Sequence, residues 1–368
     1  MMCHHLLLSS LASLGAFFAS TVAIRLGPRL GAMDRPKPLS IHSRPTPRTG
    51  GLAVVAGFLL AVGWGLLFAP GLSADDRTTL LGIVMAGIIV AFLGLLDDMG
   101  RIPTRVEVSA LVLPALLVVL LGQRVGFVPV AMVSFPLTLF YLVGGASAMN
   151  LVDGMNGLAG GIGAIASGSC FLLSMGQGDT LGAVLSLALL GAVLGFLPHN
   201  FPGGKVFLGD NGSLFLGFML AVVMVRISSQ PYHLGGFLAP ILILGVPVGD
   251  TALAILRRLF QGGGVLSGDR RHTYDLLRER GLGDVATVVI MWGIAASGGL
   301  MGLLVYRVGD SATLLAPGLF VMWYGLFFSL AAVLGAFRGA SGKANLPQPP
   351  STVLRTGPGG RGVSGEAR

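Results

Sequence analysis

The first residues that could do chemistry are the adjacent carboxylates Asp97 and Asp98, which follow an apolar stretch. Two neighbouring carboxylates repel one another and are costly to place beside lipid. A divalent cation, a general-base role or a cationic partner would offset that cost. A solvated helix end explains the pair equally well, so the pair alone leaves both interpretations open.

A second polar stretch runs from Asn150 to Gly161 and carries Asn150, Asp153 and Asn156 at three-residue spacing among glycines. Glycines allow tight turns and let a backbone approach a ligand closely. The alternative is a plain turn between helices, capped by Asn and Asp side chains. The density of Asn, Asp and Gly favours a functional site.

A third stretch contains Asn200 and the string Phe207-Leu-Gly-Asp-Asn-Gly-Ser213, which opens an apolar segment. Backbone N–H groups at the start of a helix suit a phosphate. Asp210 could hold Mg2+, which takes oxygen ligands and often joins one or two carboxylates to substrate phosphates. An N-capped helix would explain Asp210 or Asn211 but not the whole string.

Two basic segments complete the set. Residues 257–284 include Arg271 and His272, and residues 42–51 include Arg48. The positive-inside rule or contact with anionic lipid would account for the arginines, whereas a histidine among arginines suits a pyrophosphate better. Carboxylates, amides, glycine-rich turns and basic loops together indicate Mg2+-assisted phosphoryl transfer on a diphosphate substrate.

The elements that must position these residues are membrane spans. The chain has 368 residues, of which 53% are hydrophobic and only 11% charged, whereas soluble domains carry about 25% charged residues. Stretches long enough to cross a bilayer recur eleven times, near 6–26, 50–69, 79–96, 107–122, 131–149, 157–175, 180–198, 212–229, 236–256, 285–306 and 313–336. We therefore expect an all-α polytopic membrane protein, a bundle of about eleven transmembrane helices with active-site loops on one face.

Lys and Arg set the expected orientation. Twenty of the 24 fall in 25–49, 97–105, 199–211, 257–284 and the C-terminal tail. This bias predicts a plasma-membrane protein with the N-terminus outside, and with the C-terminus and the polar loops in the cytoplasm. The first apolar stretch is expected to be a retained span rather than a cleaved signal, because its basic residues follow it. We expect one membrane domain over 1–337 and a disordered cytoplasmic tail over 338–368.

Other classes of function find little support. The net charge is +8, but no long basic run with interleaved aromatics indicates nucleic-acid binding. Cys3 and Cys170 have no metal-like spacing. A membrane transporter for an anionic or nucleotide-linked solute remains the alternative, although such proteins more often carry ionisable groups near mid-span.

The order and spacing of the motifs resemble one enzyme family. The Pro-Thr-Pro-Arg-x-Gly-Gly string at 45–51, the Asp97-Asp98 pair, the string at 150–161 and the Phe-Leu-Gly-Asp-Asn-Gly-Ser string look like those of the polyprenyl-phosphate N-acetylhexosamine-1-phosphate transferases of glycosyltransferase family 4. The resemblance covers nearly the whole chain. It implies a helical bundle of ten or eleven spans with a cytoplasmic active site.

The resemblance also implies roles for residues. Asp210 would bind Mg2+, with Mn2+ as the alternative ion, and Asp153 would be an essential acid beside the metal. Asp97 and Asp98 would take part in catalysis, one of them deprotonating the attacking lipid phosphate. The implied contacts with the nucleotide or its phosphates come from Asn150, Asn156, Asn200, Phe207 (stacked on uracil), Arg48, Arg271 and His272.

The implied reaction moves a sugar 1-phosphate from a UDP-sugar to undecaprenyl phosphate, releases UMP and starts a lipid-linked surface glycan. The sugar is less well defined, because the family usually has Asp at Asn156, Asn at Ser147 and a second His at Tyr274. GlcNAc-1-phosphate leads, and a deoxy sugar packed against Tyr274 is the competing prediction. Expected partners are the UDP-sugar, the lipid phosphate and membrane lipids, and the glycine-rich helices are compatible with a homodimer.

Overall fold

Long apolar helices make up nearly all of the described chain. The computed structural model describes residues 2–36, 44–260, 271–309 and 314–337. Within these ranges, nine helices are long and apolar enough to cross a membrane. They are α1 (Met2–Leu30), α2 (Gly50–Phe68), α3 (Ala74–Asp98), α6 (Ala131–Val152), α7 (Leu158–Gln177), α8 (Thr180–Asn200), α9 (Gly209–Ile227), α13 (Asp284–Val308) and α14 (Leu315–Leu334).

Two of the predicted spans are broken. The stretch at 107–122 forms α4 (Thr104–Ala110) and α5 (Val112–Leu120). The stretch at 236–256 forms α10 (Leu234–Ile243) and α11 (Gly245–Phe260), which meet at a bend of 79°. Proline three residues after each break, at Pro114 and Pro247, removes one helical N–H and crowds the preceding turn.

The described residues therefore contain nine long spans, or ten if the bent pair counts as one, in place of about eleven. The predicted all-helical membrane fold is confirmed. Its remaining described elements are the short helix α12 (Thr273–Glu279) and two antiparallel strands, β1 (Met33–Asp34) and β2 (Thr46–Pro47). All these elements belong to one compact unit, Met1–Ala336. The predicted disordered tail, 338–368, and residues 42–43 and 261–270 of the basic segments lie outside the described residues.

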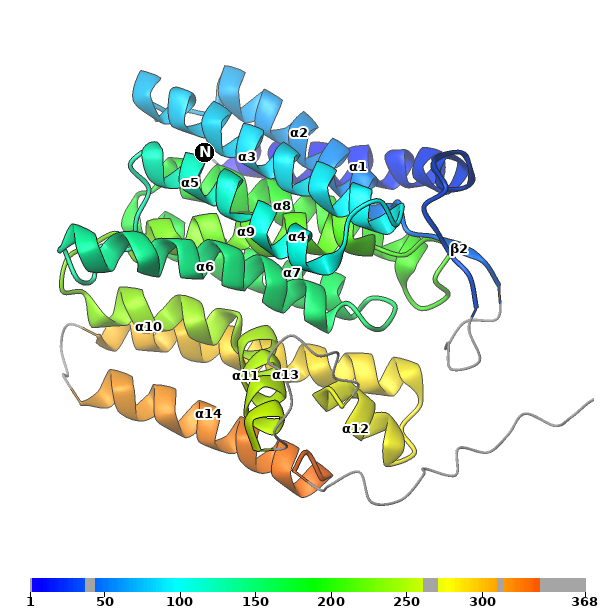
Figure 1. Ribbon diagram of the computed structural model, residues 1–368. Coiled ribbons are helices and arrows are strands. Elements are labelled where there is room, and N and C mark those ends of the chain that lie inside the picture. Colours follow the sequence, from blue (N-terminus) through cyan, green and yellow to red (C-terminus); the bar gives the residue numbers. More distant parts are fainter. Residues whose placement is uncertain (1, 37–43, 261–270, 310–313, 338–368) are drawn as a thin grey trace, which may run out of the picture. The chain divides into compact units, whose positions relative to one another are not determined.

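Helix α9 occupies the middle of the bundle. It packs against α2, α3, α6, α7 and α8, and Figure 1 shows these helices running side by side. Almost every residue of α9 is buried. A helix that is apolar on all sides belongs in a core, so α9 is the element around which the other spans are arranged.

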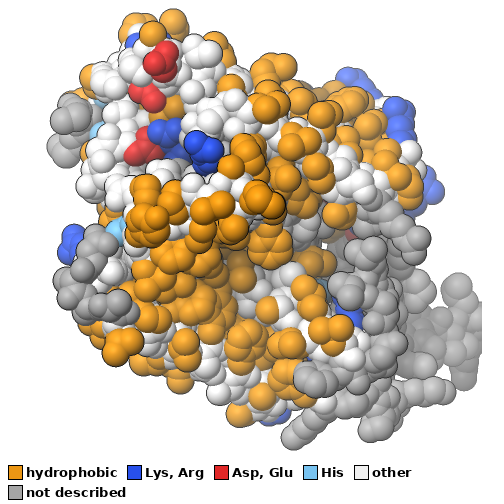
Figure 2. Space-filling view, turned by 60° about the vertical axis from the view of Figure 1, so that its left-hand side comes forward, with side chains coloured by type: hydrophobic (Ala, Val, Ile, Leu, Met, Phe, Trp, Pro, Cys, Tyr) orange, Lys and Arg blue, Asp and Glu red, His pale blue; other side chains and the backbone are white. Residues whose placement is uncertain are grey.

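The outer helices present apolar side chains outward. Leu14 and Phe18 on α1, Phe92 on α3, and Val321 and Leu326 on α14 are all more than half exposed. Hydrophobic side chains cover much of the face seen in Figure 2, where charged side chains form small groups. Such a surface needs lipid rather than water around it, so the chain is a multi-pass membrane protein.

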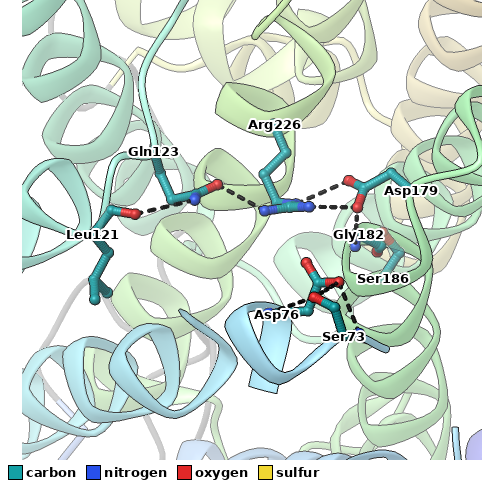
Figure 3. A network of polar contacts seen from close by, with 8 residues as sticks. All are labelled: Ser73, Asp76, Leu121, Gln123, Asp179, Gly182, Ser186 and Arg226. Carbon is teal, nitrogen blue, oxygen red and sulfur yellow. Dashed lines mark hydrogen bonds and ion pairs between the residues drawn. The ribbon is translucent and has the colours of Figure 1, made fainter. Parts of the chain in front are cut away.

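The C-terminal end of α9 is closed by an ion pair. Arg226 donates to Asp179 through Nε at 2.9 Å and through Nη2, and to Gln123 Oε1 through Nη1 at 2.7 Å. Asp179 also accepts from the Gly182 N–H at 3.1 Å, which caps α8. Figure 3 shows this network joining the last turn of α9 to the segments after α5 and before α8, beside the exposed capping box of Ser73 and Asp76.

Candidate active site at the start of helix α9

Backbone hydrogen bonds join two of the motifs that the sequence singled out. The Phe207 N–H donates to the Pro47 carbonyl at 2.8 Å, and the Gly50 and Gly51 N–H groups donate to the carbonyls of Phe207 at 2.9 Å and Leu208 at 2.8 Å. A Cβ on Gly51 would collide with Gly212 and with the Asn211 side chain. The glycine pair in the first string therefore lets α2 begin directly against α9.

Asp98 caps α9 from another helix. Its carboxylate, 7% exposed, accepts hydrogen bonds from the Asp210 N–H at 3.1 Å, the Asn211 N–H at 3.0 Å and Asn211 Nδ2 at 2.6 Å. The residue before α9, Leu208, provides no side-chain cap. Two of the first amides of α9, which the sequence suggested as phosphate donors, are thus already bonded to a carboxylate of this chain.

Asn211 ties the same cap to the first motif. Its Nδ2 atom donates to the Arg48 carbonyl at 2.6 Å as well as to Asp98. The side chain is fully buried. The sequence left a helix cap open as one explanation of Asn211, whereas in the structure the Asn211 amide bonds both Arg48 and Asp98.

Asp210, the residue before Asn211, has a side-chain partner on α6. Asn150 Nδ2 donates to Asp210 Oδ1 at 2.7 Å and lies 3.0 Å from Ser213 Oγ. The Asp97 carboxyl neighbours the Asp210 carboxyl. The structure thus brings the predicted residues Asp97, Asp98, Asn150 and Asp210 together.

Two further acids border this group. Asp153 is half-buried in the turn between α6 and α7. Burial, with the charges of Asp210 and Asp98, raises the pKa of Asp153 to about 8. Glu107 on α4, 5% exposed, lies near Asp98 and Asp210. Glu107 was not predicted, although a buried acid at the start of an apolar stretch is a signal for function.

A cavity of about 800 Å3 opens beside these acids, within the usual range for small-molecule sites. Its described lining includes the predicted residues Arg48, Asp153, Asn156, Asn200, Phe207 and Asp210. The remaining lining residues are Asp34, Arg44, Pro45, Thr46, Gly154, Met155, Phe201, Pro202, Gly203, Gly204, Lys205, Leu208, Gly209, Asp284 and Val285.

Arg48 and Lys205 bring positive charge to the cavity. Arg48 Nη2 donates to Asp34 Oδ1 at 3.0 Å, and the two side chains are 37% and 21% exposed. Asp34 is the last residue of β1, which follows α1, and the partner strand β2 leads to Arg48. A hairpin carrying a charge pair gave no clear signal in the sequence, so Asp34 was missed.

Asn200 lines the cavity, but its side-chain amide is hydrogen-bonded to the protein backbone. Its Oδ1 atom accepts from the Gly157 N–H at 2.6 Å, and its Nδ2 atom donates to the Val206 carbonyl at 2.9 Å. The predicted nucleotide contact of Asn200 stays a prediction, since both ends of the amide are occupied by backbone groups. Phe207 and Asn156 are half-buried at the cavity wall.

Arg271 and His272, in the predicted basic loop, were expected to contact substrate phosphates, but in the structure both contact other groups of the protein. His272 Nδ1 lies 2.6 Å from Asp250 Oδ2 and is buried. Arg271 Nη2 donates to the Gly335 carbonyl at 3.3 Å, near the end of α14. Neither residue belongs to the described cavity lining, so their predicted phosphate contacts stay predictions. Tyr274, 7% exposed, is also absent from that lining, and the structure gives no support to a sugar contact.

The carboxyl oxygens beside the cavity are ligands that suit a hard cation such as Mg2+. Among the described residues, no three His, Cys, Asp or Glu side chains converge as a preformed metal cluster. Magnesium does not need one, since it is usually held by one or two carboxylates with substrate phosphates and water. The carboxyls of Asp210 and Asp153 in the cavity lining, with Asp97 beside Asp210, fit such a partial site.

The family match and the individual proteins similar to this chain agree with one another. Residues 80–228 match the family described as "Glycosyl transferase family 4". The chain is 34% identical over 325 residues to decaprenyl-phosphate N-acetylglucosaminephosphotransferase of Mycobacterium tuberculosis, covering 78% of this chain and 80% of the relative. It is 31% identical over 277 residues to a probable undecaprenyl-phosphate N-acetylglucosaminyl 1-phosphate transferase of Bacillus subtilis, covering 73% and 75%. The corresponding Escherichia coli transferase is 27% identical over 302 residues, covering 78% and 79%.

Proposed function

Because this chain belongs to glycosyl transferase family 4, we propose that it transfers N-acetylglucosamine 1-phosphate from UDP-N-acetylglucosamine to undecaprenyl phosphate. UMP is the second product, and the lipid-linked sugar starts a surface glycan. The observation that carries the proposal is the cavity at the start of α9, where Arg48 and Lys205 face the carboxyls of Asp153 and Asp210. The cations suit a diphosphate, and the carboxyls suit a magnesium ion bound to it.

In the proposed reaction an oxygen of the lipid phosphate forms a bond to the phosphorus next to the sugar. The bond from that phosphorus to the bridging oxygen breaks, and UMP leaves with the electron pair. Bound Mg2+ supplies neutralisation of the charge that develops on the phosphate oxygens. Asp210 would hold it, with Asp153 as its second carboxylate.

The side chains of this protein would do the rest. Asp98 is fully engaged in capping α9, so we assign the proton from the lipid phosphate to Asp97. Arg48 would leave Asp34 for the diphosphate of the substrate, because a bidentate guanidinium–phosphate contact is a strong one. Phe207 at the cavity wall would stack on uracil, and Asn156 would bond the nucleotide.

Turnover by the purified protein tests the proposal. In detergent with Mg2+, undecaprenyl phosphate and UDP-N-acetylglucosamine, we expect UMP and a lipid-linked sugar in equal amounts. Other UDP-sugars, including 6-deoxy N-acetylated ones, and decaprenyl phosphate form the comparison panel. Manganese should replace magnesium, and EDTA should abolish turnover. No UMP release with any pair from the panel would refute the function.

The membrane orientation is part of the proposal. The cavity would face the cytoplasm, where nucleotide sugars are made, as the Lys and Arg bias predicts. In a Cys3→Ser background, a membrane-impermeant maleimide should label Asp75→Cys in intact cells and Gly203→Cys only after lysis. The opposite labelling would invert the orientation. The transporter alternative gains no observation from the structure.

A further inference from the structure

Aromatic side chains pack closely against the glycines in and after the turn that carries Asp153 and Asn156. A Cβ on Gly154 would collide with the Tyr274 hydroxyl, and one on Gly161 would collide with the indole of Trp292. A Cβ on Gly157 would lie 2.6 Å from the ring of Phe201. These glycines, which the sequence suggested might approach a ligand, make room for side chains of the protein itself.

Gly157 is held by hydrogen bonds on both of its backbone groups. It has a φ of 80°, a conformation that favours glycine. Its N–H donates to Asn200 Oδ1 at 2.6 Å, and its carbonyl accepts from Trp292 Nε1 at 3.1 Å. The rings of Trp292 and Phe201 are 5.0 Å apart. The Asn156 end of the turn therefore depends directly on an indole from α13.

Tyr274 is held just as firmly at the Asp153 end. Its ring stacks on His272, with centroids 5.5 Å apart and planes 9° from parallel. His272 lies 2.6 Å from Asp250, whose carboxylate also accepts from the Thr273 N–H at 2.8 Å and from Thr273 Oγ1 at 2.6 Å. Asp250 is 1% exposed. The buried carboxylate of Asp250, on α11, thus holds in place the Tyr274 side chain that packs against Gly154.

We propose that Tyr274 and Trp292 are positioning residues: Tyr274 sets the place of Asp153, and Trp292 sets the place of Asn156. Both act through the backbone of the turn and neither lines the cavity among its described residues. Both also follow the segment that matches the family, 80–228. The C-terminal helices would thereby adjust a site whose acids come from the central ones.

Plain core packing is the competing explanation, since buried aromatic residues commonly have no other role. The two explanations differ in kinetics. Packing alone predicts lost stability with unchanged kinetic constants for the folded protein. Positioning predicts that two variants of similar stability fail in different ways, because the two ends of the turn carry different groups.

The chain offers matched controls on α14. Tyr324 Oη donates to the Ile241 carbonyl at 2.9 Å, and Trp323 Nε1 donates to Ser297 Oγ at 3.0 Å. The experiment compares Tyr274→Phe with Tyr324→Phe, and Trp292→Phe with Trp323→Phe. The two changes of a pair are the same substitution, and only the first of each pair touches the turn.

The kinetic prediction rests on the proposed function. We expect Tyr274→Phe to lower kcat about tenfold with KM for UDP-N-acetylglucosamine within about twofold. Trp292→Phe should raise that KM about fivefold and leave kcat within about twofold, since it removes one hydrogen bond. The control variants should change neither constant by more than about twofold. Equal behaviour of test and control variants would overturn the proposal.

Hydrogen exchange separates this proposal from the proposed function. Exchange of the backbone amides in residues 150–161, measured without substrate, should be faster in Tyr274→Phe and Trp292→Phe than in the wild type and both controls. This result would support the positioning role even if no UDP-sugar were turned over. Unchanged exchange in both test variants would refute it, whatever the activity of the wild type.

Discussion

The two ends of helix α9 treat charge in opposite ways. At the C-terminal end, Arg226 meets Asp179 in a pair whose side chains are 16% and 14% exposed, and Gln123 takes a further N–H of the guanidinium. At the N-terminal end, Asp98 accepts three hydrogen bonds while the carboxyls of Asp97 and Asp210 adjoin each other. One end contains its own counter-charge, and the other gathers acids beside a cavity.

We interpret the ion pair at the C-terminal end of α9 as stabilising the fold, and the carboxyls at its N-terminal end as available to bind a ligand. A carboxylate with a local cation gains little from anything added later. Neighbouring carboxyls with their nearest arginine already bonded to Asp34 gain much from a cation or from rearrangement around a phosphate. We therefore expect changes at the two ends of α9 to act on different properties of the protein.

The largest effect is expected from Asp210→Asn. If Asp210 holds the metal at the transferred phosphate, turnover should fall by about 10^3-fold or more, which corresponds to about 4 kcal/mol. Stability should change by less than about 1 kcal/mol, because Asn is also accepted in the first turn of a helix. UMP release and a thermal melt in detergent measure the two quantities.

Asp76→Asn is the matched control for that change. Asp76 also lies in the first turn of a helix, at the other end of the bundle, and its replacement should leave turnover unaltered. Near-normal activity in a well-folded Asp210→Asn protein would remove the metal assignment and with it the functional side of the comparison.

The next effect is expected at the opposite end, from Arg226→Leu. The change leaves Asp179 partly buried without its cation, which should cost about 3 kcal/mol of stability. Turnover per folded molecule should stay within about twofold, since the site lies at the other end of α9. Thermal unfolding in detergent gives the stability.

Two further variants test whether the loss of stability in Arg226→Leu comes from the unpaired Asp179. Arg124→Leu removes an exposed arginine near the same end and should scarcely alter stability. The double variant Arg226→Leu with Asp179→Leu should recover part of the loss, because it removes the unpaired charge. A large loss of kcat in folded Arg226→Leu would show that the two ends are not separate.

The smallest effect on turnover that still distinguishes the two ends is expected from Asp98→Asn, where both properties meet. An amide keeps one acceptor for the α9 amides but places its NH2 group against a donor, so about 2 kcal/mol of stability should be lost. We expect a drop of about tenfold to a hundredfold in kcat, because the start of α9 also carries Asp210. Asp75→Asn, at an exposed helix start, serves as the control. If Asp98→Asn lost activity without losing stability, Asp98 would be a reacting group instead of a cap.

Local sequence signals predicted most of the spans and singled out motifs that lie together in the structure, but they could not assign hydrogen bonds between distant segments. Asp98 and Asn211 are 113 residues apart, and no local pattern states that one caps the helix of the other. The breaks that precede Pro114 and Pro247 followed a known rule that the apolar run of the surrounding residues concealed. Glycines at 154, 157 and 161 were expected to allow close approach of a ligand, whereas the groups found against them in the structure are the side chains of Tyr274, Phe201 and Trp292.

The bond from Asn211 to the carbonyl of Arg48 spans 163 residues of sequence, and this span matters for biogenesis. Ribosomes add about 5 to 20 residues per second, so the first motif waits roughly 8 to 30 s for its partner. During that interval the N–H groups of Gly50 and Gly51 lack the acceptors they have in the finished protein, and hydrocarbon cannot supply any. The start of α2 must stay at a hydrated boundary until α9 is inserted, so the candidate site forms late in membrane insertion and a chain that ends before α9 cannot form it.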